Sequence, residues 1–265
     1  MNEAGIMNEA GNDLRVERDG AVVRLTLNRP QAMNTYTPGL VRALTDAVAA
    51  VHDDRSVSVV VLAAAGRAFC TGADFRYMDA HRDDPAAIAR FNRDLNHALT
   101  RLAHLPQPVI GQVHGHALGG GLETMLVCDL VVAAEDAVIG DPHVEINFIH
   151  GAGGSQRLPR RVGLPLALDL VLTGRRLTAR EAQAMGLVTR VVPTEELTAA
   201  VDELARNMAA RDPQTLRELK RLIHTATRVD LSTGLAMEEE AFVAHACRPG
   251  GFSGVDAFLR DRKRS

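Results

Sequence analysis

The segment Pro108–Asp129 reads PVIGQVHGHALGGGLETMLVCD, and the other motifs of the chain are arranged around it. Pro108–Val113 is a short apolar run with the character of a β-strand. Three consecutive glycines, Gly119–Gly121, follow it, and then comes the apolar run Leu122–Cys128, which carries a single acid, Glu123. This order predicts a strand that leads, through the glycines, into the start of a helix.

A helix that begins at glycines presents bare backbone N–H groups at the positive end of its dipole. Such donors stabilise a substrate oxygen that gains negative charge, which is the principle of an oxyanion hole. Glu123 lies three residues after Gly120, so its carboxylate is predicted to share the site, where burial can tune it for proton transfer. Glycine triplets also occur where a helix simply packs tightly on a sheet, and the motif alone leaves both interpretations open.

The composition indicates a globular protein without a nucleic-acid or membrane partner. Its 265 residues suffice for one large domain, and the net charge is only −3. Aromatic residues make up 3% and Trp is absent, which leaves little material for stacking on bases. No apolar run reaches the roughly 18 residues of a membrane span, and the acidic N-terminus does not resemble a secretory signal. Cys70, Cys128 and Cys247 are scattered without metal-ligand spacing, so we predict a cytoplasmic protein.

The fold class is predicted to be α/β, because buried strands alternate with helices. Strands are predicted at 14–18 and 21–27, which flank the turn Asp19-Gly20, and at 57–64, 109–113, 130–133, 137–139 and 187–192. Helices are predicted at 38–51, 85–104, 178–185, 195–210, 213–227, 231–246 and 253–261.

Two irregular segments follow predicted strands, where α/β folds place their ligand loops. Gly66–Met78 reads GRAFCTGADFRYM and directly follows a buried strand. Gly140–Gly154 is rich in glycine and contains His143, Glu145 and His150. Segments of this kind are more often functional loops than linkers.

These motifs make the sequence similar to the enoyl-CoA hydratase/isomerase family, also called the crotonase superfamily. The matches occur in order along nearly the whole chain, and several in register identify it as a member although each alone is weak. They are NRPQAMN at 28–34, AFCTGAD at 68–74, VHGHALGGGLE at 113–123, CDL at 128–130, GAGGSQRL at 151–158 and LTGRRLTAREAQAMGLV at 172–188.

The resemblance implies a crotonase-type ββα spiral core followed by a C-terminal helical trimerisation region. We place the core at residues 13–200 and the helical oligomerisation region at residues 201–265. Residues 1–12, in which MNEAG occurs twice, are predicted to be a disordered extension without function. The expected assembly is a trimer or a dimer of trimers.

The family binds acyl-CoA thioesters and stabilises an enolate with two backbone N–H groups. Carried over by motif, these donors are Ala73 and Gly120. The CoA is part of the substrate, so no cofactor is expected. The residues expected to bind the substrate are Ala68, Ala73, Asp74, Phe75, Arg76, Gly119 and Gly120.

Hydratases of the family use two glutamates to hold and activate one water, and the resemblance places the first at Glu123. The second belongs to a segment that reads GDPHVEINFIHG here, where its position is occupied by His143. In one interpretation Glu123 and His143 form an acid/base pair, because histidine titrates near neutrality. In a second, Glu145 supplies the lost carboxylate. In a third, the water site is lost and the oxyanion hole serves another reaction or binding alone.

We therefore predict an acyl-CoA lyase/isomerase with enoyl-CoA hydratase-type chemistry, Glu123 as principal acid/base and His143 as its altered partner. The alternatives are a double-bond isomerase, another acyl-CoA reaction of the family, or a member that binds acyl-CoA without turnover. His114 and His116 lack a third ligand with suitable spacing, so no metal is predicted. Asp141 is expected to lie behind the catalytic groups.

The remaining candidates are basic residues and one thiol. Arg157, Arg160 and Arg161 are expected to be surface or intersubunit charges. Cys70 lies in the acyl loop without any mark of a nucleophile. Basic residues near the C-terminus of the family meet the CoA phosphates, and Lys263 and Arg264 either do so here or belong to a solvated tail.

Overall fold

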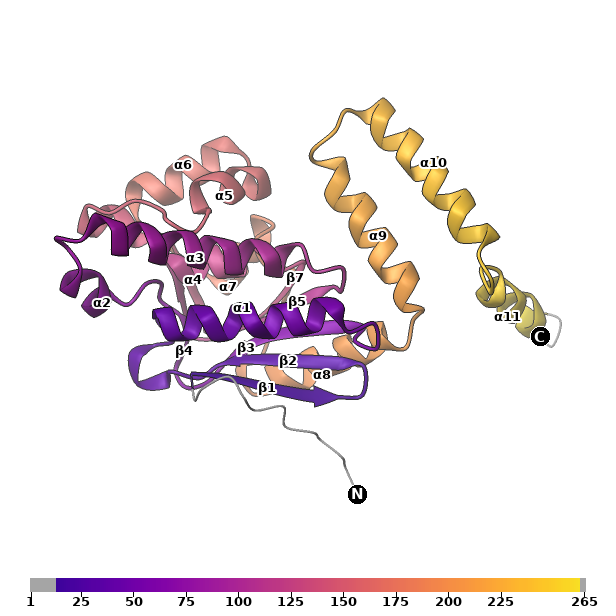
Figure 1. Ribbon diagram of the computed structural model, residues 1–265, viewed down its shortest axis with the longest axis horizontal. Helices are drawn as coiled ribbons and strands as arrows, with labels where there is room; N and C mark the ends of the chain where they lie inside the picture. The colour runs from indigo at the N-terminus through magenta and orange to yellow at the C-terminus, as the bar shows by residue number, and fades with distance from the viewer. Residues whose placement is uncertain (1–12, 263–265) are drawn as a thin grey trace, which may run out of the picture. The chain divides into compact units, whose positions relative to one another are not determined.

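The computed structural model describes residues 13–262, and these form two compact units (Figure 1). One unit extends to Ala210 and the other begins at Arg211. The predictions for residues 1–12, Lys263 and Arg264 lie outside the described residues.

A six-stranded sheet forms the centre of the first unit. Its β1–β2 pair is the predicted hairpin, antiparallel, and every other neighbouring pair is parallel. The order across the sheet is β1 (Leu14–Asp19), β2 (Val22–Leu27), β3 (Val59–Ala64), β5 (Val109–Val113), β7 (Leu130–Ala134) and β10 (Arg190–Val192). β3 and β5 are buried along almost their whole length, as their β-branched runs predict.

A second, four-stranded sheet consists of three-residue strands. Their order is β4 (Ala68–Cys70), β6 (His116–Leu118), β8 (Val138–Gly140) and β9 (Arg176–Thr178). β3 is followed by β4, β5 by β6 and β7 by β8, so each turn of the chain gives one strand to each sheet before a helical segment. The predicted α/β class with a ββα repeat is thereby confirmed.

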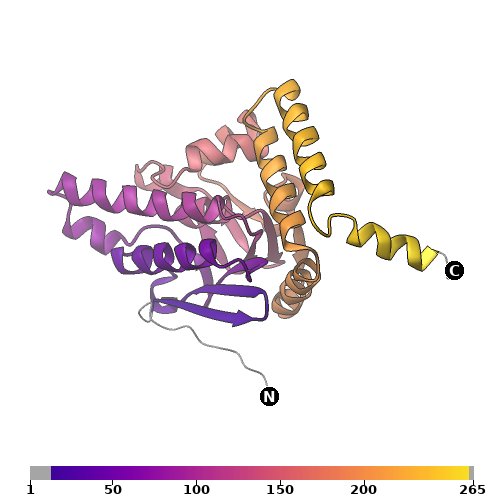
Figure 2. The same cartoon turned by 45° about the vertical axis from the view of Figure 1, so that its right-hand side comes forward.

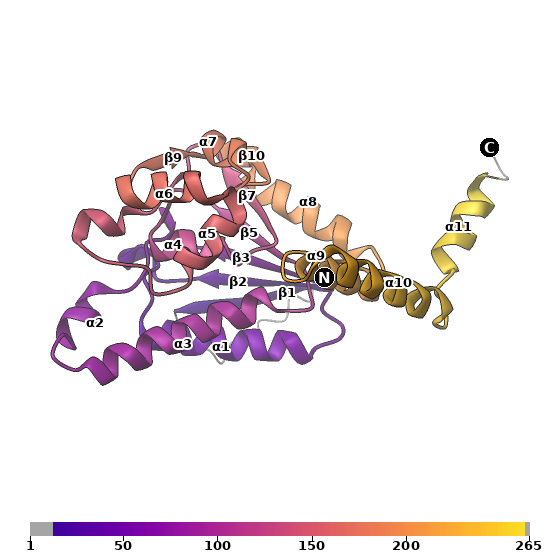
Figure 3. The ribbon, with the colours of Figure 1, turned by 90° about the horizontal axis from the view of Figure 1, so that it is seen from above.

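Helices cover both faces of the large sheet. Successive side chains of β3 point to opposite faces, so each face packs against different helices. Val60 and Leu62 pack into the main core with α1 (Pro38–Asp53) and α3 (Pro85–Ala103). Val59 and Val61 pack on the other face against α8 (Leu197–Ala209), and Figure 3 shows these layers from above. Thr37 caps α1 and Asp84 caps α3. Each side chain accepts a hydrogen bond from the backbone N–H of the third residue of its helix.

The remaining helices of the first unit are short. They are η1 (Pro30–Ala32), α2 (Phe75–Ala80), α4 (Gly120–Met125), η2 (Pro142–Ile146), α5 (Gly154–Val162), α6 (Leu164–Thr173), α7 (Ala179–Ala184) and η3 (Thr194–Glu196). The capping box predicted at Thr178 and Glu181 is present at the start of α7. α2 begins inside the segment 66–78, which is predicted to be irregular, and ends two residues beyond it.

The second unit consists of α9 (Pro213–Ala226), α10 (Leu231–Cys247) and α11 (Ser253–Arg262), and Figure 2 shows the α9–α10 pair. The division of the chain falls after Ala210, ten residues beyond the predicted boundary. α8 belongs with the core because Leu197, Val201 and Ala205 form an apolar stripe that is buried on the six-stranded sheet. Within residues 13–262, no helix combines the length and the apolarity that crossing a membrane requires.

Candidate active site

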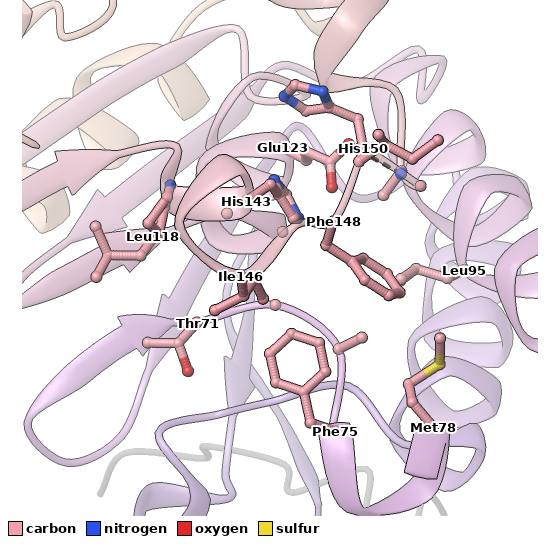
Figure 4. A pocket seen from close by; sticks show the side chains of 18 of the residues that line it. Thr71, Phe75, Met78, Leu95, Leu118, Glu123, His143, Ile146, Phe148 and His150 are labelled. Carbon is pink, nitrogen blue, oxygen red and sulfur yellow. Dashed lines mark hydrogen bonds between the residues drawn. The ribbon is translucent and has the colours of Figure 1, made fainter. Parts of the chain in front are cut away.

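Three parallel strands of the small sheet end at one edge, and their following loops form the candidate site. β4 leads into Thr71–Ala73, β6 into Gly119 and Gly120, and β8 into Asp141. Because the carboxyl ends of parallel strands lie at the same edge, segments far apart in the sequence meet here. Residues of all three loops line a cavity of about 470 Å³ (Figure 4).

The two predicted oxyanion donors lie on loops that touch through their backbones. A Cβ atom on Gly120 would lie 2.6 Å from Gly72 Cα and 3.7 Å from Ala73 N, so only glycine permits this approach. Gly72 has φ of +98°, a conformation that also favours glycine. Among residues 13–262, no hydrogen bond has the amide of Ala73 or of Gly120 as its donor. Both residues line the cavity, so both N–H groups remain candidate donors to a ligand.

Glu123 lies in the first turn of α4 and is only 2% exposed. Its Oε1 accepts the backbone N–H groups of Ala152 at 2.9 Å and Gly154 at 2.7 Å. Burial raises the pKa of the Glu123 carboxyl, although these two hydrogen bonds and the nearby histidines oppose the shift. A carboxyl with a raised pKa is suited to exchange protons near neutrality.

Asp141 is fully buried and joins two histidines that also line the cavity. His143 Nδ1 lies 2.5 Å from Asp141 Oδ1, and His150 Nε2 hydrogen-bonds to Asp141 Oδ2. Asn147 adopts a left-handed conformation, and Phe148 N donates to His143 O at 2.9 Å, which turns the chain back so that position 150 meets position 141. The two imidazole rings are 5.0 Å apart.

The Asp141 carboxylate determines which nitrogen of each histidine carries a proton. Burial alone would raise the pKa of Asp141, but the hydrogen bonds and charges of His143 and His150 outweigh it and hold the pKa far below its usual value. An ionised carboxylate only accepts hydrogen bonds, so His143 Nδ1–H and His150 Nε2–H are the donors. This leaves His143 Nε2 as the second ring nitrogen, 3.4 Å from the position that a Cβ on Gly119 would take.

His150 is the site residue that the sequence interpretation left without a role. Burial lowers its pKa, but the hydrogen bond and charge of Asp141, together with the charge of Glu123, outweigh burial and raise it. The signal available in the sequence was its place in the glycine-rich segment 140–154, beside His143. Only the turn at Asn147 makes the two histidines partners.

Glu145 is the alternative source of the second carboxylate, and the structure directs it elsewhere. Its Oε1 accepts a hydrogen bond from Arg176 Nη1 at 2.8 Å, and its Oε2 accepts one from Arg176 Nη2 at 2.9 Å. The pair is exposed, and the pKa of Glu145 is held low by the Arg176 hydrogen bond. The geometry favours His143 over Glu145 as the partner of Glu123.

The wall of the cavity away from these polar groups is apolar. Figure 4 shows Phe75, Met78 and Phe148 on this side, and the rings of Phe75 and Phe148 meet edge to face with centroids 6.0 Å apart. The apolar side chains that line the cavity are Phe75, Met78, Ile88, Phe91, Leu95, Leu118, Ile146, Phe148 and Ile149. A hydrocarbon chain would find favourable burial there.

A second cavity of about 910 Å³ adjoins the first, with which it shares Thr71, Ala73, Phe75, Leu118, Pro142 and Arg176. Four arginines line it, namely Arg29, Arg67, Arg76 and Arg176. Asp74 also lines it and pairs with Arg29 at 3.2 Å. The surplus of positive charge suits an anionic ligand.

Comparison with known proteins identifies the chain. A sequence model of the enoyl-CoA hydratase/isomerase family matches residues 17–265. The chain belongs to this family. It is 38% identical over 251 residues to the 2,3-dehydroadipyl-CoA hydratase of Escherichia coli, covering 95% of this chain and 97% of the relative. It is 35% identical over 247 residues to a probable enoyl-CoA hydratase of Mycobacterium bovis, covering 93% and 95% of the two chains.

Solved structures of enoyl-CoA hydratases share the fold. A crystal structure of enoyl-CoA hydratase from Bacillus anthracis superposes with a TM-score of 0.90 at 34% identity and covers 94% of this chain and 96% of that one. The structure of Pseudomonas aeruginosa DspI superposes with a TM-score of 0.91 at 30% identity, covering 96% and 97%. The crotonase-type core predicted from the motifs is therefore confirmed.

The residues expected to bind the substrate are divided between the two cavities, except for Ala68. Ala73 lines both cavities, Gly119 and Gly120 line the first, and Asp74 and Arg76 line the second. Phe75 also lines both cavities. Ala68 lines neither, because it is buried in β4, where its carbonyl accepts the Asn34 side-chain amide at 2.8 Å.

Arg157 differs from the surface charge that was expected in this family member. Its Nη1 donates to Ala152 O at 2.6 Å and its Nη2 to Thr100 Oγ1 at 3.0 Å. The Ala152 amide donates to Glu123, so Arg157 supports the loop that holds the Glu123 carboxyl. Arg160 and Arg161 are both exposed, as expected, and they donate to Gln156 O and to Cys128 O respectively.

Metal-binding side chains in the described part of this hydratase-family chain converge at one place. Asp141, His143 and His150 each offer a ligand atom, and these atoms lie within 4.8 Å of one another. His114 and His116 are not part of the group, and His114 Nε2 bonds to Gly66 O. The three converging side chains already satisfy one another through two hydrogen bonds, so the prediction that no metal takes part is retained. Cys70 is buried, which raises the pKa of its thiol to about 12 and makes it a poor nucleophile.

Proposed function

We propose that the protein hydrates the α,β double bond of 2-enoyl-CoA thioesters, with Glu123 and His143 as the acid/base pair. The observation that carries the proposal is the position of both side chains on the cavity wall beside the Ala73 and Gly120 amides. Hydratase chemistry needs these two elements together, an oxyanion site and a water-activating pair.

In the proposed mechanism the thioester oxygen accepts hydrogen bonds from the amides of Ala73 and Gly120. Water lies between Glu123 and His143 Nε2, and one of these bases removes its proton. The water oxygen forms a bond to the β carbon while the double-bond electrons shift toward the thioester oxygen as an enolate. Each preorganised N–H donor stabilises that charge by about 3–4 kcal/mol, by analogy with other oxyanion holes. The enolate then collapses as the α carbon takes a proton from the conjugate acid.

Asp141 and the surrounding backbone keep the two bases in their roles. The bond from His143 Nδ1–H to Asp141 leaves Nε2 to handle the proton of the water. Burial raises the pKa of Glu123, which makes its carboxylate a stronger proton acceptor than that of an exposed glutamate. The reaction consumes no cofactor, since water and the thioester supply all atoms.

The cavities favour an apolar acyl group joined to an anionic carrier. The apolar wall around Phe91 and Leu95 suits a hydrocarbon chain, and the arginine-lined cavity suits the phosphates of CoA. One relative is named for 2,3-dehydroadipyl-CoA, whose acyl chain ends in a free carboxylate. Here Arg176, which lines the acyl cavity, already binds Glu145, so we expect hydrocarbon acyl chains to be preferred over dicarboxylic ones.

Hydration of crotonyl-CoA by the purified protein tests the proposal. Glu123→Gln should lower kcat by about 10²–10⁴-fold, because general acid/base groups contribute on that scale. Glu145→Gln is the matched control and should change kcat by less than about threefold, since its carboxylate binds Arg176. A wild type that does not hydrate crotonyl-CoA would refute hydratase function, and an active Glu123→Gln variant would refute the role of Glu123.

We further propose assembly as a trimer or a dimer of trimers through the unit that begins at Arg211. Large apolar side chains of this unit are exposed in the single chain, among them Ile223, Leu231, Phe242 and Phe258, with Phe242 72% exposed. Exposed apolar surface of this extent supports a subunit interface, and light scattering gives the mass that tests it. A cytoplasmic location remains our prediction.

A further inference from the structure

Tyr36 lies between the two segments that carry the proposed oxyanion donors. Its side chain is completely buried, and it directly precedes Thr37, the N-cap of α1. It lines neither of the two cavities described above. Any effect of Tyr36 on the reaction is therefore indirect and acts through the residues that Tyr36 contacts.

The backbone of Tyr36 binds on both sides of Ala73. Tyr36 N donates to Gly72 O at 2.8 Å, and Asp74 N donates to Tyr36 O at 2.9 Å. The Gly72 carbonyl and the Ala73 N–H belong to one planar trans peptide, in which the two groups point in opposite directions. Holding the carbonyl of Gly72 therefore sets the direction of the Ala73 N–H.

The phenol of Tyr36 reaches the other donor segment through Thr124. Thr124 Oγ1 donates to Gly120 O at 2.7 Å and lies 2.9 Å from the Tyr36 hydroxyl. A carbonyl only accepts, so the single Thr124 proton is committed to Gly120 and Tyr36 must be the donor to Thr124. Burial raises the pKa of Tyr36 well above its usual value, so the phenol keeps the proton that this bond needs.

No side chain separates the two donor segments. A Cβ on Gly120 would lie 2.6 Å from Gly72 Cα, and one on Gly72 would lie 3.1 Å from Gly120 N. Their spacing cannot be set by interlocking side chains, because both residues are glycines. Tyr36 is bonded to one segment by its backbone and to the other through Thr124, which makes it a rigid link across this contact.

We propose that Tyr36 is a positioning residue that sets the direction of the Ala73 amide and its distance from the Gly120 amide. The inference rests on the proposed oxyanion hole and adds the element that holds its two halves in register. Oxyanion donors act through preorganised geometry, so a small displacement of one donor weakens the stabilisation of the enolate more than the binding of the substrate.

Tyr36→Phe removes the phenol hydroxyl and keeps the ring. Tyr77→Phe is the matched control, because Tyr77 is the other of the two tyrosines and its ring stacks on His81 and Phe91 outside this link. For hydration of crotonyl-CoA we expect Tyr36→Phe to lower kcat about 5–50-fold with KM changed less than about twofold. Tyr77→Phe should keep the wild-type kcat and KM.

A second measurement reports the oxyanion hole without turnover. Bound acetoacetyl-CoA forms an enolate with near-ultraviolet absorbance, and the fraction present as enolate should fall in Tyr36→Phe and stay unchanged in Tyr77→Phe. Thr124→Val breaks the same link from its other side, and the double variant should be no worse than Thr124→Val alone. This second route keeps the test informative if Tyr36→Phe folds poorly.

Three results would overturn the inference. One is a wild-type kcat and enolate fraction in Tyr36→Phe, and another is an equal loss in Tyr77→Phe. The third is a loss of activity in both Tyr36→Phe and Thr124→Val that merely follows a lowered melting temperature. Failure of the proposed function looks different, because the wild type would then not hydrate crotonyl-CoA while enolate formation would still report on Tyr36.

Discussion

At the scale of single residues, the site depends on one buried carboxylate that serves two imidazoles. Asp141 Oδ1 accepts from His143 and Oδ2 from His150, so both oxygens are used and neither histidine can rotate freely. A glutamate at position 143 would need no such partner. The histidine in its place does, because an imidazole has two nitrogens and only one of them can serve as the base.

Asp141→Asn is expected to lower kcat for crotonyl-CoA hydration at least about tenfold. An asparagine side chain has one acceptor oxygen, so its NH₂ group meets one of the two imidazoles and forces that ring to change tautomer or orientation. Steady-state kinetics measure the effect. Asp136→Asn is the control, since Asp136 is exposed on the turn after β7. An Asp141→Asn variant with wild-type kcat would exclude the Asp141–His143 bond from the mechanism.

At the scale of elements, the glycine triplet allows α4 to begin against β4. A Cβ on Gly121 would lie 1.9 Å from Cys70 O and 2.7 Å from Cys70 C, which are backbone atoms that cannot give way. Gly119, with φ of +56°, makes the turn, and Gly120 carries the amide proposed as an oxyanion donor. The tight packing is therefore compatible with the proposed oxyanion site, because both need glycines at the same positions.

Gly121→Ala should destabilise the protein by about 3 kcal/mol or more, because the start of α4 must move away from β4. Gly39→Ala serves as the comparison. Gly39 lies in α1 with no atom nearer than 3.7 Å to the new Cβ, so it should be neutral or stabilise by about 0.5–1 kcal/mol. Denaturant unfolding gives both free energies. Similar values for the two variants would mean that α4 does not rest on β4 as closely as described.

At the scale of the whole molecule, the buried ionisable groups make folding stability depend on pH. His150 has a raised pKa in the folded protein, so its contribution is complete below the unfolded pKa of about 6.5 and is lost as the pH rises through the folded pKa. Asp141 changes the folding stability at acidic pH instead. Its low folded pKa contributes stability above an unfolded pKa of about 3.9, which is lost as the pH falls.

The melting temperature of the wild type should therefore fall from pH 6 to pH 9, and part of this fall should disappear in His150→Gln. Glu123 also has a raised pKa, and its charge raises the pKa of His150, so the difference between the two proteins reports the coupled pair. Thermal unfolding across this range makes the measurement. Parallel pH curves for wild type and His150→Gln would show that His150 gains no proton affinity on folding.

The sequence by itself determined the family, the long strands of the large sheet and most helices. Buried β-branched runs such as Val59–Ala64 and caps such as Thr178 are local signals that read directly from residue order. The short strands β4, β6 and β9 were not predicted, because three residues are too few for a periodic pattern. Helix α8 was placed partly in the C-terminal region, since an apolar stripe does not say which surface will bury it.

Some residues of the candidate site were likewise predicted from the sequence, and others were found only in the structure. Motifs placed Glu123, His143, Ala73 and Gly120, because each lies in a segment that resembles the family at a fixed position. Asp141 as a shared acceptor, His150 as its second partner and Tyr36 as the link between loops were decided by the tertiary structure. These contacts join residues that meet only because parallel strands end at one edge and the chain reverses at Asn147, and no local pattern records such a meeting.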